Sequence, residues 1–148
     1  MKIDVTKCTD AQLETLMANA VKSKDPTAAE VWRSAAIEVH RRGGSDYTDP
    51  VVAACHGALA LLDKARFETT GQRRKSNYSL RSIQNNGEIA FMTYCALGKS
   101  QGTGFKLLVE RGLGHYTVEH IVATNPDRFP VEAVTSARAR LAEHGIAP

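Results

Sequence analysis

Apolar residues recur with helical spacing through most of the chain. In residues 9–24 they lie three or four positions apart, which places them on one face of an α-helix. Thr9 followed by Gln12 three residues later predicts a capping box at the start of this helix. The apolar face consists of Leu13, Leu16, Met17, Ala20 and Val21.

An aspartate followed by a proline predicts the start of each of two further helices. Asp25 is expected to cap the first, with Pro26 as its first helical residue and Gly43 at its end. The same start recurs at Asp49 and Pro50. Five further segments with helical character follow, each bounded by a glycine, asparagine, threonine or proline, at residues 77–85, 88–98, 105–113, 117–125 and 127–145.

No run of alternating β-branched residues predicts a strand. The pattern therefore predicts an all-α fold, a compact bundle of seven to eight helices with essentially no sheet. The expected organisation is one helical domain over residues 1–148. An alternative is a boundary near Gly71, with a three-helix part over residues 1–70 and a compact helical module over residues 71–148.

The composition fits a soluble globular protein rather than a membrane or disulfide-rich one. The chain has 148 residues, of which 43% are hydrophobic and 24% charged. No apolar run approaches the length of a membrane span, and the first ten residues lack the apolar region of a secretory signal. Three cysteines without CxxC spacing indicate neither a disulfide framework nor a zinc knuckle. We therefore expect a cytoplasmic protein without a cofactor or metal ion.

The positive charge of the chain is concentrated in one place. The net charge is +3, whereas residues 63–81 alone carry six basic and two acidic side chains. Residues 71–87 contain no acidic residue at all. A local excess of positive charge attracts phosphate groups, which makes this segment the candidate for binding DNA or RNA.

Helical spacing arranges this segment into two faces. Arg74, Tyr78, Arg81 and Asn85 fall at i, i+4, i+7 and i+11, whereas Leu80 and Ile83 fall on another side. Arginine binds phosphate, asparagine can read adenine, and tyrosine can stack on an unpaired base. The candidate nucleic-acid-binding residues are Arg73, Arg74, Lys75, Tyr78, Arg81 and Asn85.

These observations leave three hypotheses. The first is a small non-enzymatic module that binds nucleic acid through the basic helix; the common alternative for such a charged run is simply a solvated helix face. The second is a protein-interaction or scaffold domain that docks another protein or a second copy of the chain. A helix-turn-helix reading around Asn86–Gly87 is disfavoured, because the second helix is largely apolar and carries no basic residue.

The third hypothesis is an enzyme. Glu110, His115, Glu119 and His120 lie within eleven residues, and such side chains can bind metals or move protons. Their spacing matches no known ligand motif. We therefore interpret them as polar groups at a corner between two helices, and we assign neither catalytic nor metal-binding residues.

The segment from about Lys75 to Leu141 resembles a group of uncharacterised bacterial helical proteins. Their pattern contains Gly-aromatic-x-x-Leu-Val-Glu-x-Gly-Leu, followed by Pro-x-x-Phe and an Ala-Arg-Leu helix. Relatives often carry Lys-x-Gly before the arginine helix, where this chain has other basic residues. The resemblance implies a compact helical module and transfers no activity. The matching residues here are Arg81, Ile83, Gly87, Gly104, Phe105, Leu108, Val109, Glu110, Gly112, Leu113, Pro126, Phe129, Ala139, Arg140 and Leu141.

Overall fold

The structure is a computed structural model that describes residues 4–70, 77–98 and 104–147, with only the backbone described for residues 66–70, 77 and 78. Eight α-helices and three short 3-10 helices make up the described part, which contains no strand, so the prediction of an all-α bundle is confirmed. In chain order the elements are η1 (Val5–Lys7), α1 (Asp10–Lys22), α2 (Ala28–Gly43), α3 (Pro50–Thr70), α4 (Asn77–Asn86), α5 (Glu88–Ala96), α6 (Gly104–Glu110), η2 (Gly114–Tyr116), α7 (Val118–Thr124), η3 (Pro126–Arg128) and α8 (Val131–Glu143).

The local signals for helix starts are confirmed at two helices. The Thr9 hydroxyl accepts from the backbone N–H of Gln12 at 3.1 Å, and the Gln12 side chain accepts from the backbone N–H of Thr9 at 2.8 Å. Pro50 is the first residue of α3, and Asp49 accepts from the backbone N–H of Val51 at 2.9 Å. Both caps satisfy N–H groups that no helical carbonyl can reach.

The predicted start of α2 is wrong by two residues. The helix begins at Ala28, and its N-cap is Thr27 rather than Asp25. The Asp25 carboxylate instead accepts hydrogen bonds from the backbone N–H of Thr27 at 2.9 Å and from its hydroxyl at 2.8 Å. These two hydrogen bonds form a turn between Asp25 and Thr27. The Asp25 carboxylate therefore stabilises this turn and does not cap the helix. The predicted end at Gly43 is confirmed.

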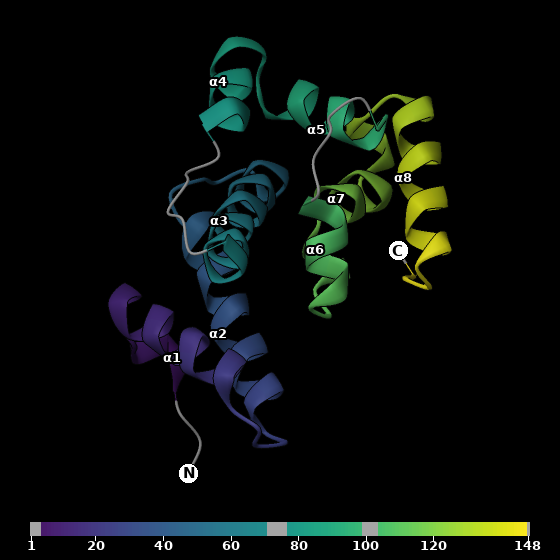
Figure 1. The fold of residues 1–148 in the computed structure, drawn as a ribbon. Helices are drawn as coiled ribbons and strands as arrows, with labels where there is room; N and C mark the ends of the chain where they lie inside the picture. The colour runs from purple at the N-terminus through teal and green to yellow at the C-terminus, as the bar shows by residue number, and fades with distance from the viewer. Residues whose placement is uncertain (1–3, 71–76, 99–103, 148) are drawn as a thin grey trace.

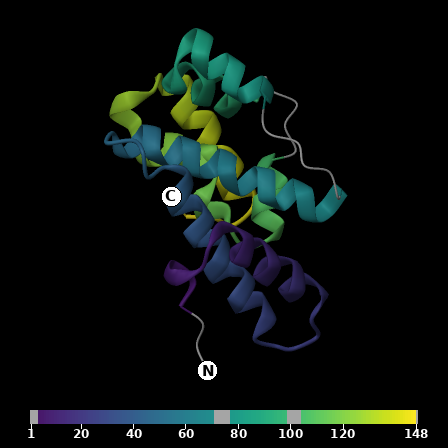
Figure 2. The same ribbon diagram turned by 90° about the vertical axis from the view of Figure 1, so that its left-hand side faces the viewer.

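Helix α3 runs across the middle of the molecule, between α1 and α2 on one side and α4, α5 and α8 on the other (Figures 1 and 2). Its two halves contribute to different groups of buried side chains. The N-terminal core cluster consists of Leu13, Met17, Trp32, Ala35, Ala36, Val39, Leu61, Leu62, Ala65, Leu108 and Leu113. The C-terminal core cluster consists of Val51, Cys55, Ala58, Leu59, Phe91, Met92, Ala96, Val118, Ile121, Val122, Ala123, Phe129, Ala133, Val134, Ala137 and Leu141.

The sharing of α3 bears on the alternative domain boundary near Gly71, which itself lies outside the described residues. The first half of α3 contributes Val51, Cys55, Ala58 and Leu59 to the C-terminal core cluster, and its second half contributes Leu61, Leu62 and Ala65 to the N-terminal core cluster. Division of the chain into residues 1–70 and 71–148 stays a prediction. Any such division would leave the C-terminal core cluster without the side chains that α3 supplies.

Close packing between α2 and α3 depends on glycine. A Cβ atom on Gly57 would lie 2.6 Å from the backbone oxygen of His40, and one on Gly43 would lie 2.7 Å from the Cβ of Ala60. Such distances are far shorter than a normal carbon contact.

None of the helices that the structure describes combines the length and the apolar content needed to span a bilayer.

Candidate nucleic-acid interface

Helix α4 lies at the edge of the molecule, packed chiefly against α5 (Figures 1 and 2). Leu80 and Ile83 are half-buried and pack against the C-terminal core cluster. Arg81, Gln84 and Asn85 are exposed. The helix therefore separates an apolar side, which anchors it, from a polar side that faces solvent, as the sequence pattern predicts for these residues.

Arg81 differs from the arginines that stabilise the fold. Arg41 and Arg42 pair with Glu38, Arg128 pairs with Asp49, and Arg140 pairs with Glu119. No ion pair joins Arg81 to a carboxylate in the part of the chain that the structure describes. Its guanidinium group is consequently accessible to an external anion.

The rest of the predicted binding set is only partly described. Arg73, Arg74 and Lys75 lie outside the described residues. Tyr78 belongs to the first turn of α4, but only its backbone is described. Along the helix axis, Tyr78, Arg81 and Asn85 occupy positions i, i+3 and i+7, so their Cα atoms lie on the same side of α4.

The turn after α4 does not present a recognition helix. Gly87, with a φ of 90°, forms the N-cap of α5, a backbone conformation that favours glycine. Phe91, Met92 and Ala96 of α5 are buried in the C-terminal core cluster. Because α5 is a core helix, any contact with nucleic acid would come from α4 and the residues before it.

The acidic and histidine residues of the helix corner do not form one site. Glu119 is buried, and its carboxylate accepts from Arg140 at 2.6 Å. Burial raises the pKa of Glu119, although the hydrogen bond from Arg140 acts in the opposite direction. Glu110 is exposed. Among the described residues, no group of three or more histidine, cysteine, aspartate or glutamate side chains is arranged to hold a metal ion.

Arg140 of α8 contacts three other elements of the fold near the end of α5. Besides pairing with Glu119, it donates to the carbonyl oxygen of Cys95 at 3.3 Å and lies over the ring of Phe105, 5.8 Å from its centre. Ser136 donates to the carbonyl oxygen of Ala96 at 2.7 Å. Ser136 therefore supplies a partner for the Ala96 carbonyl at the end of α5, whereas the Cys95 carbonyl also accepts from the backbone N–H of Gly98 at 3.0 Å.

The cysteines give no sign of a reactive thiol in the core. Cys55 is fully buried in the C-terminal core cluster, and burial raises its pKa to about 12. Cys95 packs against the same cluster and is half-buried. A thiol with so high a pKa stays protonated, so Cys55 packs as a small apolar side chain.

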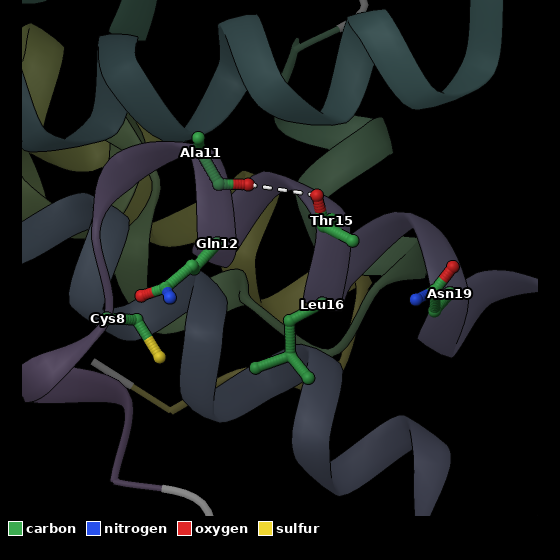
Figure 3. Close-up of a pocket in the computed structure, with 6 residues that line it drawn as sticks. All are labelled: Cys8, Ala11, Gln12, Thr15, Leu16 and Asn19. Carbon is green, nitrogen blue, oxygen red and sulfur yellow. Dashed lines mark hydrogen bonds between the residues drawn. The ribbon is translucent and has the colours of Figure 1, made fainter.

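A shallow groove of about 370 Å³ follows one side of α1 (Figure 3), and the sequence analysis did not identify it. Thr15 donates to the carbonyl oxygen of Ala11 at 3.0 Å, so its hydroxyl proton is already engaged within α1. The spacing of the lining residues along the helix could have indicated an uncharged stripe. The lining residues are Cys8, Ala11, Gln12, Thr15, Leu16 and Asn19, none of them charged.

Comparison of the chain with protein-family models, with curated protein sequences and with solved structures gives no match.

Proposed function

We propose that the protein is a small nucleic-acid-binding module that uses the solvent side of α4 together with the basic residues directly before it. The observation that carries this proposal is the orientation of α4. Leu80 and Ile83 fix the helix on the core, and Arg81 and Asn85 remain exposed on the opposite side. This exposed side continues a seventeen-residue segment, residues 71–87, that has four basic and no acidic residues.

The chemistry of these groups suits a phosphate backbone. An arginine fork forms two parallel hydrogen bonds to a phosphate, and no carboxylate among the described residues is paired with the Arg81 fork. Arg73, Arg74 and Lys75 would add charge without base specificity, whereas Asn85 can form hydrogen bonds to a base edge. Binding would therefore be largely electrostatic and depend steeply on salt concentration.

The test is a salt titration of binding to labelled duplex DNA, single-stranded DNA and RNA. We expect the logarithm of the association constant to fall linearly with the logarithm of the salt concentration. Arg81→Gln should lower the slope by about 0.9 on duplex DNA, which is the value for one lost phosphate contact. Arg33→Gln is the matched control, because Arg33 is another exposed helical arginine, on α2, and its loss removes the same charge.

Two results would contradict the proposal. One is the absence of salt-dependent binding to all three nucleic acids. The other is an equal effect of Arg81→Gln and Arg33→Gln on the slope, which would mean that only the net charge of the protein matters. Triple substitution of Arg73, Arg74 and Lys75 by glutamine extends the test to the segment before α4.

A protein-interaction domain is the second candidate function, and the groove beside α1 is the observation that favours it. Its uncharged and largely apolar lining, which includes Leu16, suits a helix of a second copy of this chain. Sedimentation at increasing protein concentration tests this. Self-association that Thr15→Arg abolishes, without loss of helical signal, would support it; a monomer at all concentrations would exclude this occupant.

A further inference from the structure

His115 and His120 are held near each other by the turn that begins α7. The buried Thr117 hydroxyl donates to the carbonyl oxygen of Gly114 at 2.8 Å and accepts from the backbone N–H of His120 at 3.1 Å. This fixes the backbone between the two histidines. Their ring centres lie 5.0 Å apart, and the ring planes are inclined by 71°.

Neither of these rings is hydrogen-bonded or ion-paired to another described residue, whereas two other histidines are. His40 bonds to the backbone of Ala54, and His56 lies 3.6 Å from the carboxylate of Glu88. His115 is exposed and His120 is half-buried. Both imidazoles therefore keep nitrogen atoms that are available to an external ligand.

The separation of the rings fits two imidazoles bound to one metal ion. Zinc binds histidine nitrogen at about 2.0–2.1 Å, which places the metal roughly 3.2 Å from each ring centre. With a tetrahedral angle at the metal, the two ring centres would be about 5 Å apart. The 5.0 Å separation of the ring centres is close to this value. An edge-to-face contact of two free histidines has a similar separation, and the zinc titration described below distinguishes the two arrangements.

We propose that His115 and His120 form an open two-histidine site for a divalent transition-metal ion such as Zn²⁺ or Cu²⁺. Water, or a side chain of another molecule, would complete the coordination. This site is independent of the proposed nucleic-acid contact through α4.

Glu119, adjacent to His120, is engaged by Arg140 and is not counted as a ligand. With two protein ligands the affinity should be modest, and Cu²⁺ should bind more tightly than Zn²⁺.

The test uses the full chain without an affinity tag, titrated with Zn²⁺ and followed by calorimetry and by the NMR signals of the histidine rings. We expect one equivalent of zinc to shift the His115 and His120 signals together. His115→Ala and His120→Gln should each weaken binding by about tenfold or more, because each removes one of two ligands. His144→Ala is the matched control, since His144 is exposed and packs edge-on against Phe105 instead of another histidine.

Circular dichroism of each variant shows whether the fold is kept. Because His115 is exposed, His115→Ala should disturb the fold less than His120→Gln. Cys8→Ser should bind zinc as the unsubstituted protein does. The proposal is overturned if His115→Ala binds zinc with unchanged affinity or if Cys8→Ser weakens binding. It is also overturned if the ring signals of His115, His120 and His144 all shift alike when zinc is added.

Discussion

The Nε of Arg42 lies 2.6 Å from Oε2 of Glu38, a carboxylate whose side chain is only 3% exposed. The same arginine donates to Asp10 at 2.9 Å and to the carbonyl oxygen of Cys8 at 2.6 Å. Arg42 therefore connects a buried charge on α2 to the segment that leads into α1. Arg41 also pairs with Glu38, at 2.7 Å, but its own side chain is 61% exposed and forms no hydrogen bond or ion pair with another element in the described part of the chain.

We expect Arg42→Ala to destabilise the protein more than Arg41→Ala. Both substitutions remove an ion pair with Glu38, but only the first also removes the hydrogen bonds to the α1 entry. Because the Arg41 side chain is 61% exposed, solvent weakens its ion pair with Glu38, so Arg41→Ala should lower the urea midpoint only modestly. Urea unfolding of the two variants side by side measures the difference; equal losses would show that the contacts of Arg42 with Asp10 and Cys8 contribute nothing.

Stability should fall in acid because of Glu38. Hydrogen bonds from Arg41 lower the pKa of Glu38 to about 2, against the opposing effect of burial. Since the pKa is lower in the folded protein than in the unfolded chain, this carboxylate stabilises the fold fully above about pH 4.5. Its contribution is lost as the pH falls from there towards 2.

Unfolding free energies measured at pH 6, 4.5 and 3 test this dependence. Glu38→Gln should be less stable than the unsubstituted protein at pH 6, and the gap should narrow at pH 3. Asp49, whose pKa is also lowered by Arg128, provides a comparison at an exposed pair. A gap that stays constant across this range would assign the effect of Glu38→Gln to shape and hydrogen bonding instead of charge.

Removal of Arg140 should be more damaging than removal of both partners of its ion pair. Arg140→Leu leaves the buried Glu119 without its partner, which typically costs about 3–5 kcal/mol. Glu119→Leu combined with Arg140→Leu leaves no unpaired charge and should be more stable than Arg140→Leu alone. A double-mutant cycle on unfolding free energies measures this. If the double variant is the least stable of the set, the carbonyl contacts of Arg140 matter more than the ion pair.

Features that depend on neighbouring residues could be predicted from the sequence. The capping box at Thr9 and the start at Pro50 need only a few adjacent side chains, and both are confirmed. Asp25 shows how this fails, because the same residue types also form a turn that uses up the carboxylate. Competition between the two arrangements is decided by a difference too small to read from the sequence.

Features that depend on tertiary packing could not be predicted. Glu38 lies close in sequence to Arg41 and Arg42 near the end of α2, yet it is buried and both arginines donate to it. The contact between His115 and His120 arises from the turn capped by Thr117, and five-residue spacing gives no motif that would indicate it. The exposed side of α4 was predictable because Leu80 and Ile83 have helical spacing, although the binding role of that side stays a prediction.

Adjacent residues on α4 should separate packing from binding. Leu80 is half-buried against the C-terminal core cluster, so Leu80→Ala should cost about 1–3 kcal/mol of stability, less than at a fully buried site. Arg81 is exposed on the neighbouring position, so Arg81→Ala should leave the unfolding midpoint unchanged. Its effect should appear in binding, as a lower salt slope.

The unfolding midpoint in urea and the salt dependence of binding should be measured for both Leu80→Ala and Arg81→Ala. The orientation of α4 predicts a different result for each variant in each measurement. Leu80→Ala should weaken binding only at urea or temperature conditions where α4 begins to detach, because it removes no phosphate contact. Arg81→Ala should weaken binding at every urea concentration and temperature. The loss of affinity should be largest at low salt and should shrink as the salt concentration rises. If Arg81→Ala lowers stability and leaves the salt slope intact, α4 is held to the fold by its arginine, and the proposed contact with nucleic acid through this helix is wrong.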